Sequence, residues 1–213
     1  MKLFYCEVVN PRKACAVARY LELPVEFVRV DVFRGENKTP EFLALNPNGQ
    51  VPVLQDGART LPESNAIMCY LSDKAGADLW PHDARQIEIL RWLSWDAQHF
   101  SRHAASFYFE RVIKPFAGRQ LDPAPLAAAD GPFRTHAGVL DRHLRGRRYV
   151  VGERLSVADF ALAAMLPYAE RALLPLGEFP EIRRWHEQLL ELPAWRAPFP
   201  PTREAVLLGG NLA

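Results

Sequence analysis

Hydrophobic and polar positions divide the chain into two parts with different periods. In the first third, short apolar runs alternate with amphipathic segments. The runs predict four strands, at 2–6, 25–30, 51–54 and 59–61. The amphipathic segments predict three helices, at 10–22, 40–46 and 63–75. This order, β-α-β-α-β-β-α, implies an α/β layer whose first two strands run parallel across a helix.

From about residue 79 the strand signals stop, and apolar residues recur only at helical spacing. Residues 85–113 form one long helical pattern, and GRQLDPAPLAAADGP is expected to break it. Its apolar stripe consists of Leu93, Ala97, Phe100, Ala104 and Phe107. The next helix is marked by Phe133, Ala137, Leu140 and Leu144. Ser156 and Asp159 then have the spacing of a capping box, and Pro180 opens an amphipathic helix.

We therefore predict an α/β domain over residues 1–78 and an all-helical domain over residues 85–213. The last residues, PFPPTREAVLLGGNLA, have no clear period. Their apolar AVLL is expected either to cover a substrate pocket or to dock on a neighbouring helix. The net charge of +1, with both signs interspersed, indicates neither a nucleic-acid nor a membrane partner. An odd number of cysteines, three, argues against a disulfide framework, so we expect a cytoplasmic protein.

A proline interrupts the third predicted strand. Pro52 stands between two valines directly after a Gly-Gln turn, although proline has no N–H to give to a strand ladder. We predict that the Val51–Pro52 bond is cis and that the Val51 backbone faces a cleft. The free N–H and C=O of Val51 would then pair with an extended peptide. An ordinary edge-strand proline is the alternative.

Glu63 and Ser64 open the helix that follows. The first N–H groups of a helix have no intrahelical partner and favour an anion. The Ser64 hydroxyl suits a carboxylate, and the Glu63 carboxylate suits an ammonium; plain helix capping is the alternative for both. Together with Val51, these residues predict a site for a small peptide with a free amino-acid head.

These motifs resemble the cytosolic glutathione transferase family, in particular its theta-like and bacterial members. The resemblance rests on FLALNPNGQVPVLQDG, TLPESNAIMCYL and YVVGERLSVADFALA, and it extends over residues 1 to about 197. It implies a thioredoxin-like domain followed by a helical bundle, usually as a homodimer. It also implies that Val51 beside cis-Pro52 pairs with the cysteinyl unit of glutathione, and that Glu63 and Ser64 hold the γ-glutamyl head. Gln50, with Lys38 or Asn37, would reach the glycine carboxylate.

The resemblance also implies a group that activates the glutathione thiol. A free thiol has a pKa of about 8.5, and a helix N-terminus together with a hydrogen-bond donor lowers it. Many relatives carry a serine, tyrosine or cysteine before the first helix, but here Val8 and Val9 stand there. Asn10 is the first choice as donor, although it also suits the helix N-cap, and Tyr5 is the second. Cys6 is expected to be a structural thiol.

The long helix carries a second set of residues, Trp92, Trp95, Asp96, His99 and His103. By resemblance to the family, this face would line the electrophile pocket and the dimer cleft, and we take Trp95 and His99 as candidate substrate contacts. Half-buried packing is the alternative. His99 and His103 lack a third ligand at a familiar spacing, so we expect no metal.

The leading hypothesis is a transferase that conjugates glutathione to a small hydrophobic electrophile. Two alternatives stay open. One is a glutathione-dependent reductase of disulfides or peroxides, because such relatives often lack the serine or tyrosine too. The other is a non-catalytic binding protein on the same fold, against which the intact Gln50, Val51, Glu63 and Ser64 argue.

Overall fold

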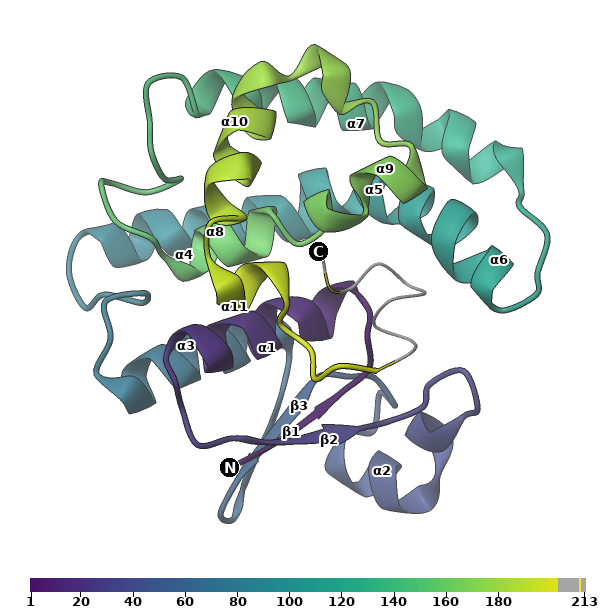
Figure 1. The fold of residues 1–213 in the computed structure, drawn as a ribbon, viewed down its shortest axis with the longest axis vertical. Coiled ribbons are helices and arrows are strands. Elements are labelled where there is room, and N and C mark those ends of the chain that lie inside the picture. Colours follow the sequence, from purple (N-terminus) through teal and green to yellow (C-terminus); the bar gives the residue numbers. More distant parts are fainter. Residues whose placement is uncertain (203–210, 212–213) are drawn as a thin grey trace.

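The computed structural model describes residues 1–202 and 211. Its first part is a four-stranded sheet with helices on both faces, and the rest is helical (Figure 1), as the sequence predicted for the fold class. None of the helices in the described part is both long and apolar enough to cross a membrane. The AVLL segment, residues 205–208, lies outside the described residues.

The sheet has the strand order β2-β1-β3-β4. Its strands are β1 (Lys2–Tyr5), β2 (Glu26–Arg29), β3 (Val53–Asp56) and β4 (Arg59–Pro62). β1 and β2 are parallel, which confirms the predicted crossover, and β3 is antiparallel to both β1 and β4. Because side chains alternate along a strand, Leu3 and Leu54 join the large core, whereas Val53 packs with Phe42 on the other face.

The helices of this first part cover both faces of the sheet (Figure 1). They are α1 (Val9–Tyr20), the 3₁₀ turn η1 (Glu36–Lys38), α2 (Pro40–Leu45) and α3 (Ser64–Ala75). α1 and α3 lie between the sheet and the helical part, and α2 lies on the opposite side. α2 begins where the Thr39 hydroxyl accepts a hydrogen bond from the Phe42 N–H at 3.3 Å.

Two details of the strand and helix boundaries differ from the prediction. β3 begins at Val53, so Pro52 precedes the strand, because pairing with β4 starts where an N–H is available. The Val51–Pro52 bond is cis, which confirms that prediction. Asn10 is not the N-cap of α1, since Val8 takes that position and the Arg12 N–H bonds the Val8 carbonyl at 3.1 Å. Pro11 still falls within the first turn, where a missing N–H costs nothing.

The long helix runs from residue 85 to 116 without a break but changes its winding twice. Its parts are α4 (Arg85–Trp95), η2 (Asp96–Phe100), α5 (Ser101–Tyr108), η3 (Phe109–Ile113) and α6 (Lys114–Phe116). η2 and η3 are π-helical turns, each of which inserts an extra residue into the α-helical register. For this reason Asp96 is buried and Ala97 is exposed, contrary to the predicted stripe.

The next helix, α7 (Pro123–His143), begins ten residues before Phe133. The predicted break after the long helix is present at residues 117–122 but shorter than expected, because the Asp122 carboxylate accepts from the Ala124 N–H at 3.0 Å and Pro123 occupies the first helical position. Buried residues continue at helical spacing on both sides of Pro132, a proline within α7.

The remaining helices bring the chain back to the first part. They are α8 (Val157–Leu162), η4 (Leu166–Tyr168), α9 (Ala169–Ala172), η5 (Leu176–Glu178), α10 (Pro180–Leu189) and α11 (Pro193–Arg196). The capping box of Ser156 and Asp159 is present, which confirms the sequence signal. α11 packs beside α1, where Trp195 is fully buried and its carbonyl accepts a hydrogen bond from Arg12 (Figure 1).

Candidate active site

Three hollows with shared lining residues lie around the N-terminal ends of α1 and α3 and the long helix. The notch, about 30 Å³, is lined by Asn10, Asn46, Gln50, Val51, Pro52, Glu63 and Ser64. The polar cavity, about 300 Å³, adds Lys13, Asn65, Asp96, Ala97, Ser101, Arg102, Ala105 and Met165 to Asn10, Glu63 and Ser64. The apolar cavity, about 380 Å³, lies on the other side of Asn10. Asn10 therefore stands where all three meet.

The notch exposes an unpaired stretch of backbone. The Val51 side chain packs against the cluster of Val30, Phe42 and Val53, and Val51 also lines the notch. Within residues 1–202 and 211, neither the N–H nor the C=O of Val51 has a hydrogen-bond partner. The Asn46 amide donates to the Gln50 carbonyl at 2.8 Å and fixes the turn before it. An extended peptide can therefore pair with this backbone.

The N-terminus of α3, with its unpaired N–H groups, borders the same notch. The first intrahelical bond runs from Ile67 to the Glu63 carbonyl at 2.9 Å, so the N–H groups of the three preceding residues have no intrahelical partner. Glu63 has a φ of 70°, a conformation uncommon for a residue with a side chain. Among the described residues, neither the Glu63 carboxylate nor the Ser64 hydroxyl forms a hydrogen bond, so both are available to a ligand.

The N-terminus of α1 offers a second set of donors. Val9 and Asn10 are its first two residues, and no side chain caps it. Asn10 is exposed, and its amide has no hydrogen-bond partner in the described part of the chain. Because the amide is not used for capping, it is free to donate to an anion held at the end of this helix.

The other candidates before α1 lie beneath this surface. Tyr5 is 2 % exposed, its ring stacks on that of Phe199 with the centroids 5.8 Å apart, and burial raises the pKa of Tyr5 to about 12. Cys6 is fully buried, and burial, with the nearby Glu7 carboxylate, raises the pKa of Cys6 to about 12. Neither side chain lines the three hollows.

The two residues expected at the glycine end are placed differently. Gln50 lines both the notch and the apolar cavity. Lys38 is exposed at the rim, and its ammonium donates to the Gly49 carbonyl at 3.3 Å, to which the Asn37 amide also donates at 2.7 Å. Gly49 has a φ of 59°, and a Cβ there would lie 2.9 Å from the Asn37 backbone carbonyl oxygen, so this turn requires glycine.

The apolar cavity is formed by both parts of the chain. The first part contributes Val8, Val9, Val32, Phe33, Asn37, Gly49, Gln50 and Val51 beside Asn10. The helical part contributes Ala105, Tyr108, Phe109, Ile113 and Met165. Most of these side chains are apolar, so the cavity suits a hydrophobic small molecule next to the end of α1.

Trp95 and His99 lie on another side of the long helix. Their rings lie 5.9 Å apart and pack against His136 of α7, at 5.9 Å from Trp95 and 4.7 Å from His99. Neither residue lines the three hollows. Among the described residues, no group of three or more His, Cys, Asp and Glu side chains is arranged to hold a metal ion.

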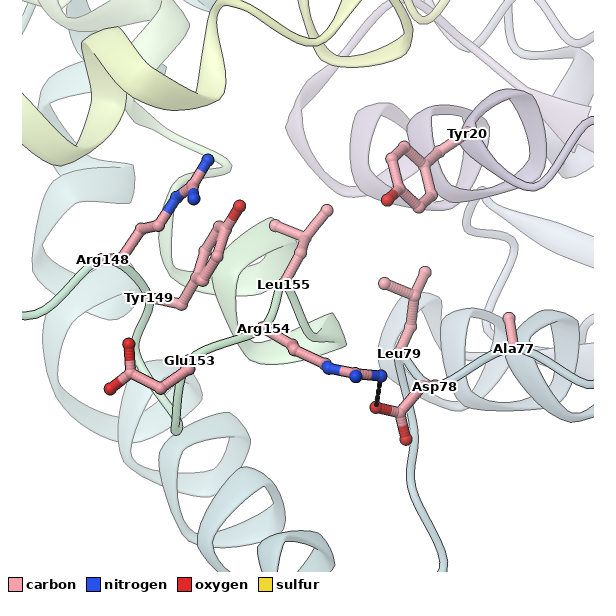
Figure 2. Close-up of a pocket in the computed structure, with 9 residues that line it drawn as sticks. All are labelled: Tyr20, Ala77, Asp78, Leu79, Arg148, Tyr149, Glu153, Arg154 and Leu155. Atoms are coloured by element: carbon pink, nitrogen blue, oxygen red, sulfur yellow. Dashed lines mark ion pairs between the residues drawn. The ribbon is translucent and has the colours of Figure 1, made fainter.

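A fourth pocket, about 360 Å³, lies at the far end of α1 (Figure 2). Tyr20 faces it from α1, Arg148 and Tyr149 face it from the loop after α7, and Arg154 points toward Asp78. The Asp78 carboxylate pairs with Arg154 at 3.5 Å and with Arg85 at 2.8 Å. None of the residues predicted for the site lines it, and its Asp78 carboxylate is already paired.

Several lining residues escaped the sequence analysis. Lys13 and Asn65 each sit one turn or less after a predicted helix start, and that position was a usable signal for a helix-end site. Tyr108, Phe109 and Ile113 had no such signal, because the π-helical turns shift the faces of the long helix.

The fold defines a two-domain protein with a thioredoxin-like first domain and a helical second domain, and the candidate site opens between them. Two family models match the chain: "Glutathione S-transferase, N-terminal domain" over residues 3–73 and "Glutathione S-transferase, C-terminal domain" over residues 124–193. The chain belongs to the glutathione S-transferase family.

Relatives come from plants and bacteria. The chain is 33 % identical to glutathione S-transferase 3 of Zea mays, with 90 % of this chain and 91 % of the relative aligned. It is 32 % identical to glutathione S-transferase GstB of Escherichia coli K12, over 88 % and 91 % of the two chains. A solved theta class glutathione S-transferase from Xanthomonas axonopodis pv. citri, with glutathione bound, is 30 % identical and superposes with a TM-score of 0.83, over 92 % and 94 % of the two chains. The predicted family and its theta-like, bacterial type are thus confirmed.

Proposed function

We propose that the chain binds glutathione across the notch and the polar cavity and joins it, through its sulfur, to an electrophile in the apolar cavity. The single observation that carries this proposal is the position of Asn10, the residue common to all three hollows. A thiolate held at Asn10 would have the peptide site on one side and the hydrophobic site on the other. Membership of the family supports the same chemistry.

The backbone of Val51 pairs with the cysteinyl unit of glutathione in this proposal. Its unpaired N–H and C=O support that role, and Pro52 supplies the bend before β3. Ser64 and the first N–H groups of α3 receive the γ-glutamyl carboxylate, and Glu63 faces the γ-glutamyl ammonium. The Gln50 amide reaches the glycine carboxylate from the notch, and the Lys38 ammonium, which lies at the Gly49 carbonyl, is a second, cationic contact.

The Asn10 amide and the N–H groups that begin α1 stabilise the thiolate. A shift of two pKa units from about 8.5 makes the thiolate the majority form at pH 7 and corresponds to about 2.7 kcal/mol. Asn10 is preferred to Tyr5 because its amide is exposed and unpaired, whereas Tyr5 is buried under Phe199. In the reaction the thiol proton leaves to solvent, the sulfur forms a bond to the electrophilic carbon, and a halide departs with the bonding electrons.

The wall of the electrophile site consists of Phe33, Tyr108, Phe109, Ile113 and Met165. Trp95 and His99 are not given this role, since they pack on α7 outside the cavity. Turnover of an aryl halide by the purified protein with glutathione tests the proposed activity. Turnover of hydroxyethyl disulfide or cumene hydroperoxide, without aryl-halide conjugation, would favour the reductase instead. Absence of glutathione binding in calorimetry would favour the non-catalytic protein.

A homodimer in the cytoplasm completes the proposal. Ile87 and Leu90 are 66 % and 47 % exposed one turn apart on α4, an apolar face that a second copy would cover. All three cysteines are free thiols, as expected for a reducing compartment. Light scattering tests the dimer: the wild type would have twice the mass of the chain, and an Ile87→Glu variant would be monomeric.

A further inference from the structure

The fourth pocket, at the far end of α1, shares no lining residue with the three hollows of the candidate active site (Figure 2). Its volume of about 360 Å³ lies within the range of small-molecule sites. Because an α-helix rises about 1.5 Å per residue, Tyr20 at this pocket lies roughly 15 Å along α1 from Asn10. A molecule bound here would therefore leave the proposed glutathione site open.

Two tyrosine rings and two leucines form the inner surface of this pocket. Leu79 and Leu155 are 4 % and 8 % exposed. The rings of Tyr20 and Tyr149 face the pocket from either side of Leu155 (Figure 2). The Tyr20 ring packs against Phe160 with the centroids 5.9 Å apart, although the residue is 41 % exposed. The pocket therefore offers a supported and accessible aromatic surface to a flat ring.

Arginines gather in the loop that borders the pocket after α7. Arg145, Arg147 and Arg148 are exposed, and none of them pairs with a carboxylate in the part of the chain that the structure describes. Arg148 lines the pocket next to Tyr149, and Arg154 lines it as well. A guanidinium group stays charged at neutral pH and binds phosphate through paired hydrogen bonds. The pocket thus combines an aromatic surface with groups suited to a phosphate.

Helix α10 fixes the backbone of this loop. The Arg184 guanidinium donates to the Leu144 carbonyl at 3.0 Å and to the Arg147 carbonyl at 2.8 Å. The Gln188 amide donates to the Arg148 carbonyl at 3.1 Å. These bonds engage the backbone of the loop and not the Arg148 guanidinium. A ligand would therefore meet a loop that is already ordered, which lowers the entropic cost of binding.

The two carboxylates of the pocket differ in their pairing. Asp78 accepts two hydrogen bonds from Arg85, both at 2.8 Å, and lies 3.5 Å from Arg154. Since Arg85 already neutralises Asp78, the Arg154 side chain, which is 76 % exposed, keeps donors for a ligand. Glu153 lines the pocket without an ion-pair partner among the described residues. Its carboxylate can accept hydrogen bonds from hydroxyl groups.

We propose that the fourth pocket binds a mononucleotide. The base would stack on the rings of Tyr20 and Tyr149, and the phosphate would bind Arg148 and Arg154. The sugar hydroxyls would donate to Glu153. A carboxylate at this position disfavours a ligand that carries only an anionic group, because the two negative charges repel each other. This inference goes beyond the proposed transferase activity and does not depend on it.

Calorimetry with three probes tests the proposal on the purified full chain. The probes are adenosine monophosphate, adenosine and inorganic phosphate, at physiological salt. We expect one molecule of adenosine monophosphate to bind per chain, at least about tenfold more tightly than either of the other two, because each of these lacks one of the required groups. Saturating S-methylglutathione should leave the Kd for adenosine monophosphate unchanged, since the two sites are separate.

Four variants separate this site from general attraction to a basic loop. Arg148→Met and Tyr20→Ala should each raise the Kd for adenosine monophosphate about tenfold, by removing a charged hydrogen bond and a stacking surface. Tyr20→Phe keeps the ring and should bind as the wild type does. Arg145→Met is the matched control, an exposed arginine of the same loop that does not line the pocket. It should change the Kd less than about twofold, because salt screens its charge.

Several results would overturn the proposal. Absence of binding by adenosine monophosphate at millimolar concentration would do so directly. Equal binding of inorganic phosphate would remove the aromatic surface from the site, and equal binding of 1-naphthoate would assign the pocket to aromatic carboxylates. Equal losses in Arg145→Met and Arg148→Met, or displacement by S-methylglutathione, would place the nucleotide elsewhere. Thermal unfolding shows whether each variant is folded. Failure of the chain to turn over glutathione would overturn the proposed function and leave this inference standing.

Discussion

The two faces of α1 differ in how far their polar side chains are paired with the rest of the protein. On one face, Arg12 is fully buried, its guanidinium lies 4.9 Å from the Trp195 ring, and it donates to the Trp195 carbonyl. On the other face, Asn10 and Lys13 border cavities and have donors that the described residues do not use. We call the face with Arg12 the closed face and the face with Asn10 and Lys13 the open face. The closed face holds α1 against α11. The open face is left with polar groups that are available to a ligand.

This difference separates stability from function within one helix of twelve residues. Because the closed face holds α1 against α11, the N-terminal donors of the open face need not be paired for the protein to fold. Changes to the closed face should therefore alter the free energy of unfolding, and changes to the open face should alter activity.

The largest effect is expected on the closed face. Trp195→Ala removes a fully buried ring that contacts Phe160 and Arg12, so it should lower the free energy of unfolding by about 3–5 kcal/mol. Urea unfolding measures this change. The part of the variant that stays folded should keep its KM for glutathione. A raised KM for glutathione with an unchanged free energy of unfolding would contradict the division between the faces.

The next effect belongs to the open face. Asn10→Ala should lower kcat/KM for aryl-halide conjugation about 10- to 100-fold, since it removes one donor from the thiolate. Its free energy of unfolding should stay within about 0.5 kcal/mol of the wild type, because Asn10 is exposed and unpaired. Asn48→Ala, at an exposed asparagine that lines none of the cavities, is the matched control and should leave both quantities unchanged.

A smaller effect, on the pH dependence of the free energy of unfolding, is expected from His186, which lies near Arg12 of the closed face. Burial and the charge of Arg12 lower the pKa of His186 to about 3, and its Nε2 has no partner in the described structure. An unfolded histidine binds a proton below about pH 6.5 while the native one stays neutral, so acidification below 6.5 destabilises the fold. At pH 5.5 the wild type should have lost about 1.4 kcal/mol relative to its His186→Gln variant.

Urea unfolding of both proteins between pH 7.5 and 5.5 measures this difference. Identical pH dependence of the wild type and the His186→Gln variant would mean that His186 is solvated, and that the closed face is more open than described. Stability above pH 6.5 should not vary through this histidine.

The smallest effect concerns the wall of the apolar cavity. Phe109→Ala should raise KM for a bulky aryl electrophile a few-fold, less than about 1 kcal/mol, because Phe109 is 43 % exposed. KM for glutathione should not change. Leu121→Ala, at a residue 45 % exposed that does not line the cavity, is the control. Equal effects of the two variants would remove Phe109 from the electrophile site.

The sequence predicted correctly those elements whose structure depends on residues close together in the chain. The strands of the first domain, the cis bond at Pro52 and the capping box of Ser156 follow from proline chemistry, alternation and capping. The start of α7 was missed because Gly131 and Pro132 look like a break, whereas the buried stripe around them holds the helix together.

The site was predicted in part for the same reason. Val51, Glu63 and Ser64 could be placed because a proline and a helix start mark them in the sequence. The apolar wall from Tyr108 to Ile113 could not be placed, since a π-helical turn redirects side chains without a sequence signal. Lys13 was missed because its partners Asn65 and Asp96 come from segments far along the chain.

The central claim is that the open face of α1 holds the glutathione thiol as a thiolate at Asn10. Ultraviolet titration of the bound thiol near 240 nm, in the wild type and in Asn10→Ala, tests it directly. We expect the pKa of the bound thiol to lie about two units below the free value of about 8.5 in the wild type, and closer to the free value in the variant. A bound thiol that titrates near 8.5 in both proteins would contradict it.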